Sequence, residues 1–293
     1  MTSFNNVPLL VTGASGNLGR AAVEELIARG ATSIIAGTRD PSKLADLSAK
    51  GVEVRKVDFN DAASLPAAFA GVERVLIVST DGIGTRIAQQ TAAIEAAKSA
   101  GVKHIVYTSA PAARPDADAG LAPEHFWTEV ALASSGINFT ILRNHMYAEN
   151  NLADAAHVIA SGQLFGLIGD RGTAYVTRDD AARAAAGALL TATGNSIADV
   201  TGPAAVTNED RAALYTELTG KPVSVVALPA ADLKAGMVGT GIPEGFAEAL
   251  LAFQRDAVTG HHGVVSDVVE RYSGRKPASL KDFLLANKSA LGA

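Results

Sequence analysis

The sequence contains no cysteine among its 293 residues. Disulfide bonds, thiolate metal sites and cysteine nucleophiles are therefore excluded, and this composition fits a cytoplasmic protein. Long basic runs are also absent and the formal net charge is −5, so we expect neither nucleic acids nor anionic membrane surfaces as partners. No apolar stretch approaches the roughly 20 residues that span a bilayer. The N-terminal segment lacks the basic and apolar regions of a signal peptide.

Aromatic residues make up only 5% of the chain, whereas 48% of it is hydrophobic and alanine and glycine are abundant. A chain of this length and hydrophobicity buries a large core, as one large or two small domains. The many small residues favour helices that pack closely on a sheet.

Through the first half, apolar runs rich in Val and Ile alternate with Ala-rich amphipathic stretches. This alternation predicts an α/β fold with a Rossmann-type doubly wound parallel sheet, covered by helices on both faces. The predicted strands cover 7–11, 33–36, 52–57, 74–78, 104–107 and 139–142. The predicted helices cover 17–29, 41–50, 61–70, 85–100 and 122–135.

After Leu142 the rhythm changes, and we expect a small C-terminal α/β substrate lobe. Its predicted helices cover 147–160, 178–192, 207–219, 230–238, 243–257 and 278–289, and its predicted strands cover 173–176, 197–201 and 223–227. We therefore assign residues 1–145 to a Rossmann domain and 146–293 mainly to the lobe, with parts returning to the sheet. The Gly- and Pro-spaced segment 236–245 predicts a mobile loop, with a lid as one use for it.

Three glycines spaced three apart follow the first predicted strand and open the first predicted helix. Gly13 would make the turn, Gly16 would let a pyrophosphate approach the backbone, and Gly19 would let the helix pack against the strand. A helix N-terminus offers free N–H groups to an anion. We therefore predict a nucleotide site; the alternative is a plain tight turn. The residues of the predicted loop are Gly13, Ala14, Ser15, Gly16, Asn17, Leu18 and Gly19.

The end of the second strand indicates which dinucleotide is bound. NAD-selective sites place an acidic side chain here for the ribose 2′-hydroxyl, but positions 36–38 carry none. Arg39 would instead pair with a 2′-phosphate, with Lys43 adding charge. Asp40 precedes Pro41 and is better placed as a helix N-cap than as the NAD acid. These residues favour NADP(H); the alternative for Arg39 is an ordinary solvated arginine.

Polar residues at the ends of the next two strands extend the predicted site. Asp58 would accept a hydrogen bond from the adenine amino group, or would merely cap the following turn. Ser79 and Thr80 would flank the ribose on the nicotinamide side. These positions support one another, because ligands of such sheets bind at the carboxyl ends of the strands.

The Tyr-x-x-x-Lys pair of many short-chain dehydrogenases, in which lysine lowers the pKa of the tyrosine, is effectively missing. Only Tyr272 has a lysine four residues on, Lys276, and the intervening Gly274 and following Pro277 predict a turn far past the sheet. Reducing a ketone requires a proton along with the hydride, whereas a quinone gives a stabilised phenolate that water can protonate. The missing pair therefore favours quinone-like or other delocalised acceptors.

At this point the chain resembles a known family, the NmrA-like atypical short-chain dehydrogenases, and within it the quinone reductases and triphenylmethane reductases. The motifs that carry the resemblance are Gly13–Gly19, Thr38–Lys43, Gly101–Ser109, His125–Glu129 and Leu142–Asn144. The resemblance implies a Rossmann domain, NADPH in the cleft and hydride transfer to a small apolar conjugated acceptor. It departs at Val130, where such quinone reductases tend to have a lysine.

The resemblance also places the segment after the sixth strand beside the nicotinamide. There, Asn144 would hydrogen-bond either a developing oxyanion or the carboxamide. We expect four residues to line the substrate pocket: Pro111, His145, Met146 and Tyr147. The pair His145-Met146 differs from the residues expected there, so it leaves the identity of the acceptor open.

A second group lies on one face of the helix predicted over 123–135, where His125, Thr128 and Glu129 share a side. His125 would relay a proton with Glu129 orienting it, or the two would form a plain helix-surface pair. We expect no metal site, because the chain lacks cysteine and His261 and His262 are direct neighbours whose side chains diverge.

These observations leave three alternative functions for the protein. The first is an NADPH-dependent quinone reductase. The second is an NADP-binding redox sensor of the NmrA type with a protein partner. The third is a reductase of a dye, an enone or an aromatic aldehyde. The sequence leaves open whether the protein forms a homo-oligomer.

Overall fold

A seven-stranded parallel sheet forms the centre of the molecule, and its strand order is β3-β2-β1-β4-β5-β6-β8. The computed structural model describes residues 3–115 and 121–292. The strands are β1 (Leu9–Val11), β2 (Ile34–Thr38), β3 (Glu53–Lys56), β4 (Arg74–Ile77), β5 (His104–Ser109), β6 (Asn138–Asn144) and β8 (Ser196–Val200). With β1 between β2 and β4, this is the doubly wound Rossmann order, which confirms the predicted fold class.

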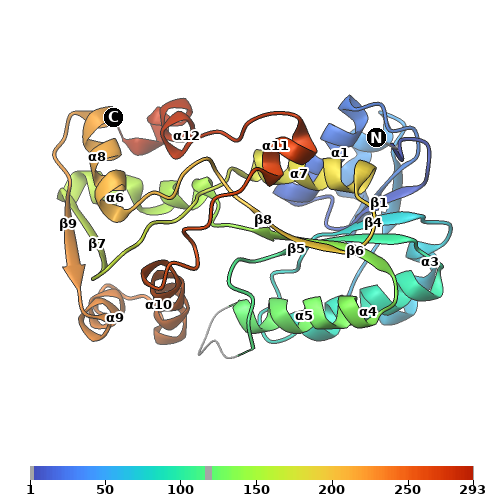
Figure 1. Cartoon of the computed structure of the whole chain (residues 1–293), viewed down its shortest axis with the longest axis horizontal. Helices are drawn as coiled ribbons and strands as arrows, with labels where there is room; N and C mark the ends of the chain where they lie inside the picture. The colour runs from blue at the N-terminus through green and yellow to red at the C-terminus, as the bar shows by residue number, and fades with distance from the viewer. Residues whose placement is uncertain (1–2, 116–120, 293) are drawn as a thin grey trace.

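Helices cover both faces of the sheet (Figure 1). One face carries α1 (Asn17–Ala28), α7 (Arg178–Thr191) and α11 (Val268–Ser273). The other carries α3 (Leu65–Phe69), α4 (Arg86–Ser99) and α5 (Ala122–Ser134). The strands are apolar on both sides for this reason: Leu9 and Val11 join the core under α1, whereas Leu10 joins the core on the opposite face.

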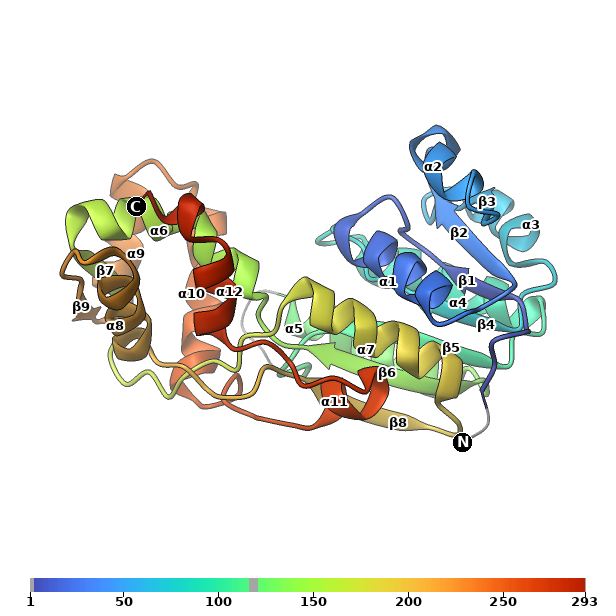
Figure 2. The same ribbon diagram turned by 90° about the horizontal axis from the view of Figure 1, so that it is seen from above.

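The remaining elements gather at one end of the molecule, in a group that we call the C-terminal lobe (Figure 2). Its helices are α6 (Leu152–Ser161), α8 (Asn208–Thr219), α9 (Ala230–Gly239), α10 (Glu244–Val258) and α12 (Leu280–Ala286). Two parallel strands, β7 (Gln163–Leu167) and β9 (Ser224–Leu228), complete it. Short helices elsewhere are α2 (Ala45–Ser48) and the 3-10 turns Pro41–Leu44, Ala62–Ser64, Ala148–Asn151 and Lys288–Leu291.

The second half of the chain contributes α7, β8 and α11 to the main sheet. Helix α7 is buried almost all round, because alanines face both the sheet and its neighbours α1 and α11. At Gly187 the backbone of α11 comes so close that a Cβ atom would lie 2.0 Å from the carbonyl oxygen of Tyr272. Small residues therefore permit this close packing, as the composition suggested.

Two predictions about the second half are wrong, and two elements were not predicted. Residues 173–176 form no strand and make only isolated bridges, Tyr147 with Val176 and Thr173 with Val206. Strand β7 and helix α11 were not predicted. The expected loop over 236–245 is helical through Gly239 and again from Glu244, because α9 and α10 are held by a small core that includes Leu233 and Leu251. Tertiary packing outweighs the weak helix propensity of the glycines there.

Candidate functional site

A tight turn after β1 exposes the start of helix α1 at the carboxyl edge of the sheet. Gly13 has φ +64°, which favours glycine, and the N–H of Gly16 donates to the carbonyl of Gly13 over 2.9 Å. Gly16 is the N-cap of α1 and provides no side-chain cap, and the first turn carries no acidic residue. The N–H groups in the first turn of α1 therefore remain available to an anion.

The same turn depends on a close approach at Gly19. A Cβ atom there would lie 2.4 Å from the carbonyl oxygen of Gly13, closer than real side chains come. The N–H of Ala14 donates to Gly37 over 2.9 Å, and the hydroxyl of Thr38 donates to Ser15 over 2.9 Å, so β2 holds the turn in place. Within the turn, Ala14, Leu18 and Gly19 are buried, while the exposed edge consists of Gly13, Ser15, Gly16 and Asn17.

The end of β2 carries an exposed arginine and a capping aspartate. Among the residues that the structure describes, none forms an ion pair or hydrogen bond with the guanidinium of Arg39. Asp40 accepts hydrogen bonds from the hydroxyl of Ser42 over 2.6 Å and from its N–H over 3.1 Å, and these bonds lower the pKa of the carboxyl. The N-cap assignment of Asp40 is confirmed, which leaves Arg39 as the exposed cation at this strand end.

The other predicted nucleotide residues lie at the carboxyl ends of β3 and β4. Asp58 accepts hydrogen bonds from Asn60, at 3.0 Å from the backbone N–H, so it caps a turn in this structure. The N–H of Ser79 donates to the hydroxyl of Thr108 over 2.9 Å, and the hydroxyl of Thr80 donates to Gln89 over 2.6 Å. The adenine role of Asp58 and the ribose role of Ser79 and Thr80 stay predictions.

Asn144 ends β6 with one half of its amide unsatisfied. The residue is 6% exposed, and its Nδ2 donates to the hydroxyl of Tyr147 over 3.2 Å. Its Oδ1 is buried, and no described residue donates to it. Burying an amide oxygen without a donor is costly, so this atom points to a ligand that carries N–H groups. The arrangement suits the carboxamide role of Asn144 better than the oxyanion role, which requires a donor.

His145 does not line a pocket, so this prediction is wrong. The imidazole is 1% exposed, with Nδ1 3.2 Å from the carbonyl oxygen of His262 and Nε2 3.1 Å from Asp199 Oδ1. The N–H of His145 also bonds Val200, which extends the pairing of β6 and β8 and turns the side chain into the protein. His145 therefore joins strands rather than meeting a substrate.

The other predicted pocket residues have different surroundings. Met146 lines a cavity of about 140 Å³ in the C-terminal lobe, together with Phe165 and Phe253. Pro111 is buried in the loop after β5. Tyr147 is half-buried and lies under the guanidinium of Arg178, 5.0 Å from its ring centre, so it faces α7.

His125 and Glu129 are both buried, so the helix-surface pair is wrong. His125 Nδ1 lies 2.7 Å from the hydroxyl of Tyr107, and burial lowers the pKa of the imidazole to about 3. Glu129 pairs with Arg143 over 2.6 Å and accepts from Ser109 over 2.6 Å. The two side chains therefore serve different partners, and Glu129 does not orient His125. His125 is only 3% exposed, so the relay role that it was predicted to share with Glu129 stays without support.

Three tyrosines of the described chain differ from the tyrosine of a dehydrogenase, whose pKa is lowered. Burial raises the pKa of Tyr107, Tyr147 and Tyr215. Tyr272 lies in α11, which ends at Gly274, and packs on the α7 side of the sheet. Tyr272 therefore lies away from the carboxyl edge of the strands. This agrees with the interpretation that its spacing to Lys276 is not the catalytic Tyr-x-x-x-Lys pair.

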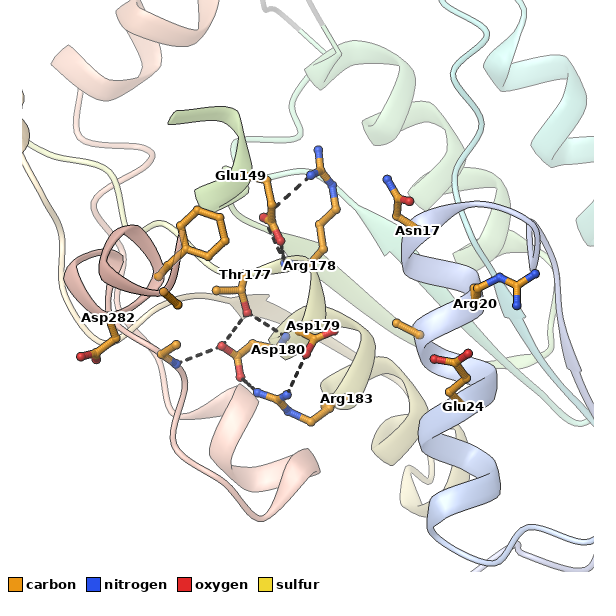
Figure 3. A pocket seen from close by; sticks show the side chains of 14 residues that line it. Asn17, Arg20, Glu24, Glu149, Thr177, Arg178, Asp179, Asp180, Arg183 and Asp282 are labelled. Carbon is orange, nitrogen blue, oxygen red and sulfur yellow. Dashed lines mark hydrogen bonds and ion pairs between the residues drawn. The ribbon is translucent and has the colours of Figure 1, made fainter. Parts of the chain in front are cut away.

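A larger cavity of about 650 Å³ lies between α1, α7 and α12, and charged residues are among those that line it (Figure 3). Asn17 of the glycine turn lines it, together with Glu149 and Arg178. Neither Glu149 nor Arg178 was predicted from the sequence. The available signal was the arginine in the first turn of a helix, where the helix dipole disfavours a cation.

Comparison with known proteins settles the family. A model described as NAD(P)H-binding matches residues 13–192. The chain belongs to this NAD(P)H-binding family. The match begins at Gly13 and ends with α7, so it spans the glycine turn, Arg39, Asn144 and Arg178.

Individual known proteins are also similar over most of the chain. Quinone oxidoreductase 2 of Escherichia coli is 40% identical over 244 residues, which are 83% of this chain and 85% of that protein. The crystal structure of the E. coli NADPH-dependent quinone oxidoreductase with NADPH has a TM-score of 0.89 at 36% identity, covering 97% of this chain and 100% of that one. Triphenylmethane reductase of Citrobacter with NADP(H) has a TM-score of 0.86 at 32% identity, covering 97% and 100%. The resemblance predicted from the motifs is confirmed.

Neither a membrane span nor a metal site emerges from the described residues. Their helices are all too short or too polar to cross a bilayer. Nowhere in residues 3–115 and 121–292 do three or more His, Asp or Glu side chains gather as metal ligands would.

Proposed function

We propose that this protein is an NADPH-dependent reductase that delivers a hydride to a quinone or a similar conjugated acceptor. The observation that carries the proposal is the uncapped start of α1, together with an exposed, unpartnered Arg39 one strand away. A diphosphate fits the first site and a 2′-phosphate fits the second. The similarity to the NADPH complex of the E. coli quinone oxidoreductase supports this assignment.

The residues of the chain fit NADPH along the whole carboxyl edge of the sheet. The glycine turn would hold the diphosphate and Arg39 the 2′-phosphate. The unsatisfied Oδ1 of Asn144 would accept a hydrogen bond from the carboxamide and so fix the ring. When bound, NADPH supplies the hydride; the protein holds donor and acceptor in contact, which is the main source of rate in such a reaction.

The acceptor class follows from the proton balance. A hydride adds two electrons and one hydrogen to a quinone, and one further proton completes the hydroquinone. The tyrosines with shifted pKa values are all shifted upward, so they are poor proton donors. A quinone tolerates this lack, because the phenolate product is stabilised and takes its proton from water. We propose that the acceptor lies beside Pro111 and Met146. We also propose that the protein is cytoplasmic.

A substrate panel tests the proposal. Purified protein is assayed for NADPH oxidation with benzoquinone, naphthoquinone, a triphenylmethane dye, an enone and an aromatic aldehyde, and calorimetry measures NADPH binding separately. We expect the quinones to be reduced fastest. If the dye or the aldehyde is reduced faster than the quinones, that compound replaces the quinone as the proposed substrate. NADPH binding with no turnover of any acceptor would favour a redox sensor and overturn the proposal.

A further inference from the structure

We propose that Arg178 is a second cationic anchor for the diphosphate of the dinucleotide, acting opposite the glycine turn. The inference rests on the proposed NADPH binding. It gives a specific role to helix α7, which begins more than 150 residues after the glycine turn.

The fold brings Arg178 to the glycine turn. Helix α1 follows β1 and helix α7 precedes β8, so in a parallel sheet both helices begin at the carboxyl edge, and they pack side by side. Arg178 is the first residue of α7, and it lines the same cavity as Asn17, the first residue of α1. In Figure 3 the two side chains extend toward the same side of that cavity.

The guanidinium of Arg178 has only loose partners. Its Nη1 lies 3.9 Å from Glu149, its Nη2 lies 3.3 Å from Asn150 Oδ1, and 32% of the side chain is exposed. Glu149 is engaged elsewhere, because it accepts the backbone N–H of Arg178 at 2.9 Å and so caps α7. The side chain is thus free to take a stronger anionic partner.

The other two arginines of this cavity are already neutralised. Arg20 forms a two-pronged pair with Asp46, at 2.7 and 3.3 Å. Arg183 pairs with Asp180 and Asp179 of its own helix. Among the arginines that line the described cavity, Arg178 has the most distant carboxylate partner, Glu149 at 3.9 Å.

Arg178 stands in the first turn of α7, whose acidic residues Asp179 and Asp180 both pair with Arg183. A cation in the first turn of a helix faces the positive end of the helix dipole. A diphosphate carries two anionic groups, and the start of α1 offers N–H groups to one of them. Because the guanidinium stacks over Tyr147, which bonds Asn144, it lies between the glycine turn and the nicotinamide end of the predicted site. It is therefore placed for the phosphate on the nicotinamide side.

This placement predicts a pattern across three ligands. NADPH and NADH share the diphosphate, whereas adenosine 2′,5′-bisphosphate lacks the phosphate on the nicotinamide side. Loss of Arg178 is expected to weaken both dinucleotides and to spare the bisphosphate. Loss of Arg39 is expected to weaken NADPH and the bisphosphate and to spare NADH.

Calorimetry with these three ligands tests the inference on Arg178→Gln, with Arg39→Gln as the contrast and Arg20→Gln as the control in the same cavity. We expect Kd for NADPH and for NADH to rise by about tenfold or more in Arg178→Gln, as loss of a charged hydrogen bond implies. Unchanged binding of both dinucleotides would overturn the proposal. So would equal weakening of the bisphosphate, since that marks a structural effect.

Two further measurements keep the outcomes separate. If Arg178→Gln unfolds at a lower temperature than wild type, Arg178→Lys replaces it, and we expect the retained charge to preserve most of the dinucleotide affinity. If Arg178→Lys binds the dinucleotides as weakly as Arg178→Gln does, the proposed anchor role of Arg178 is contradicted. Should the wild-type protein bind none of the three ligands, the proposed function itself fails.

Discussion

Gly19 lies against Gly13 so closely that a Cβ atom at residue 19 would be 2.4 Å from the carbonyl oxygen of Gly13. The carbon of the same carbonyl would be 2.7 Å away. Both contacts involve backbone atoms, which cannot rotate aside as a side chain would. The geometry of the anion site at the start of α1 thus depends on the missing side chain of one residue.

Gly19→Ala is therefore expected to displace the glycine turn. Overpacking of this kind typically costs about 1–3 kcal/mol of folding free energy, and we expect NADPH affinity to fall by at least about tenfold because the N–H groups lose their alignment. Urea unfolding and calorimetry measure the two effects. Gly236→Ala is the matched control, since a Cβ atom there meets nothing within 4 Å, and it should leave binding unchanged. Normal NADPH affinity in Gly19→Ala would contradict the role of this contact.

Asn144→Leu removes the unsatisfied Oδ1 and keeps the approximate size of the side chain. We expect NADPH affinity and turnover to fall by about tenfold, the effect of one hydrogen bond to a buried group. Binding of adenosine 2′,5′-bisphosphate should be unaffected, because it has no carboxamide. Asn138→Leu, at the exposed opposite end of β6, is the control. Equal weakening of both ligands would show that Asn144 supports the fold instead.

Arg39→Gln is expected to change the choice of cofactor. The variant should raise KM for NADPH by about tenfold or more, since a bidentate pair with a 2′-phosphate is lost, and should leave KM for NADH unchanged. Steady-state assays with both cofactors and one quinone measure the ratio. The exposed Lys50→Gln serves as a charge-matched control. An unchanged ratio would remove Arg39 from the 2′-phosphate site.

The first half of the fold was predictable because most of its strands are buried on both faces and several of its turns are marked by glycine or a cap. The predicted helix over 17–29 is α1, and Asp40 caps Ser42 as expected. These signals are local, so the sequence contains them. The glycine turn and Arg39 were found for the same reason.

The errors arose where contacts between distant segments decide the structure. His145 follows Asn144, and sequence position alone places both at the site. However, His145 bonds Asp199 and His262, more than 50 residues away, and so turns inward. Arg178 was missed because only the side-by-side packing of α1 and α7 brings it to the turn. The hydrophobic periodicity of a sequence does not predict which helices pack against each other.

Three of the buried histidines predict that stability falls in mild acid. Burial lowers the pKa of His104 and His262 to about 4 and that of His125 to about 3. In the unfolded chain these groups titrate near 6.5. Below that value the unfolded state binds more protons than the folded state, so stability is complete above about pH 6.5 and is lost as the pH falls toward 4.

The size of the effect follows from linkage. Between pH 7 and pH 5 one such histidine costs about 2 kcal/mol, because the unfolded form is protonated while the folded form is still neutral. Three together would remove a large part of the stability of an ordinary domain. Urea unfolding at the two pH values measures the loss.

His125→Asn tests the assignment to a particular residue. The variant loses the bond to Tyr107 and so is less stable at pH 7, but its loss of stability between pH 7 and pH 5 should be about 2 kcal/mol smaller than that of wild type. His157→Gln, on an exposed helix face, should keep the wild-type slope. An identical pH dependence in wild type and His125→Asn would mean that the imidazole is not buried in its neutral form.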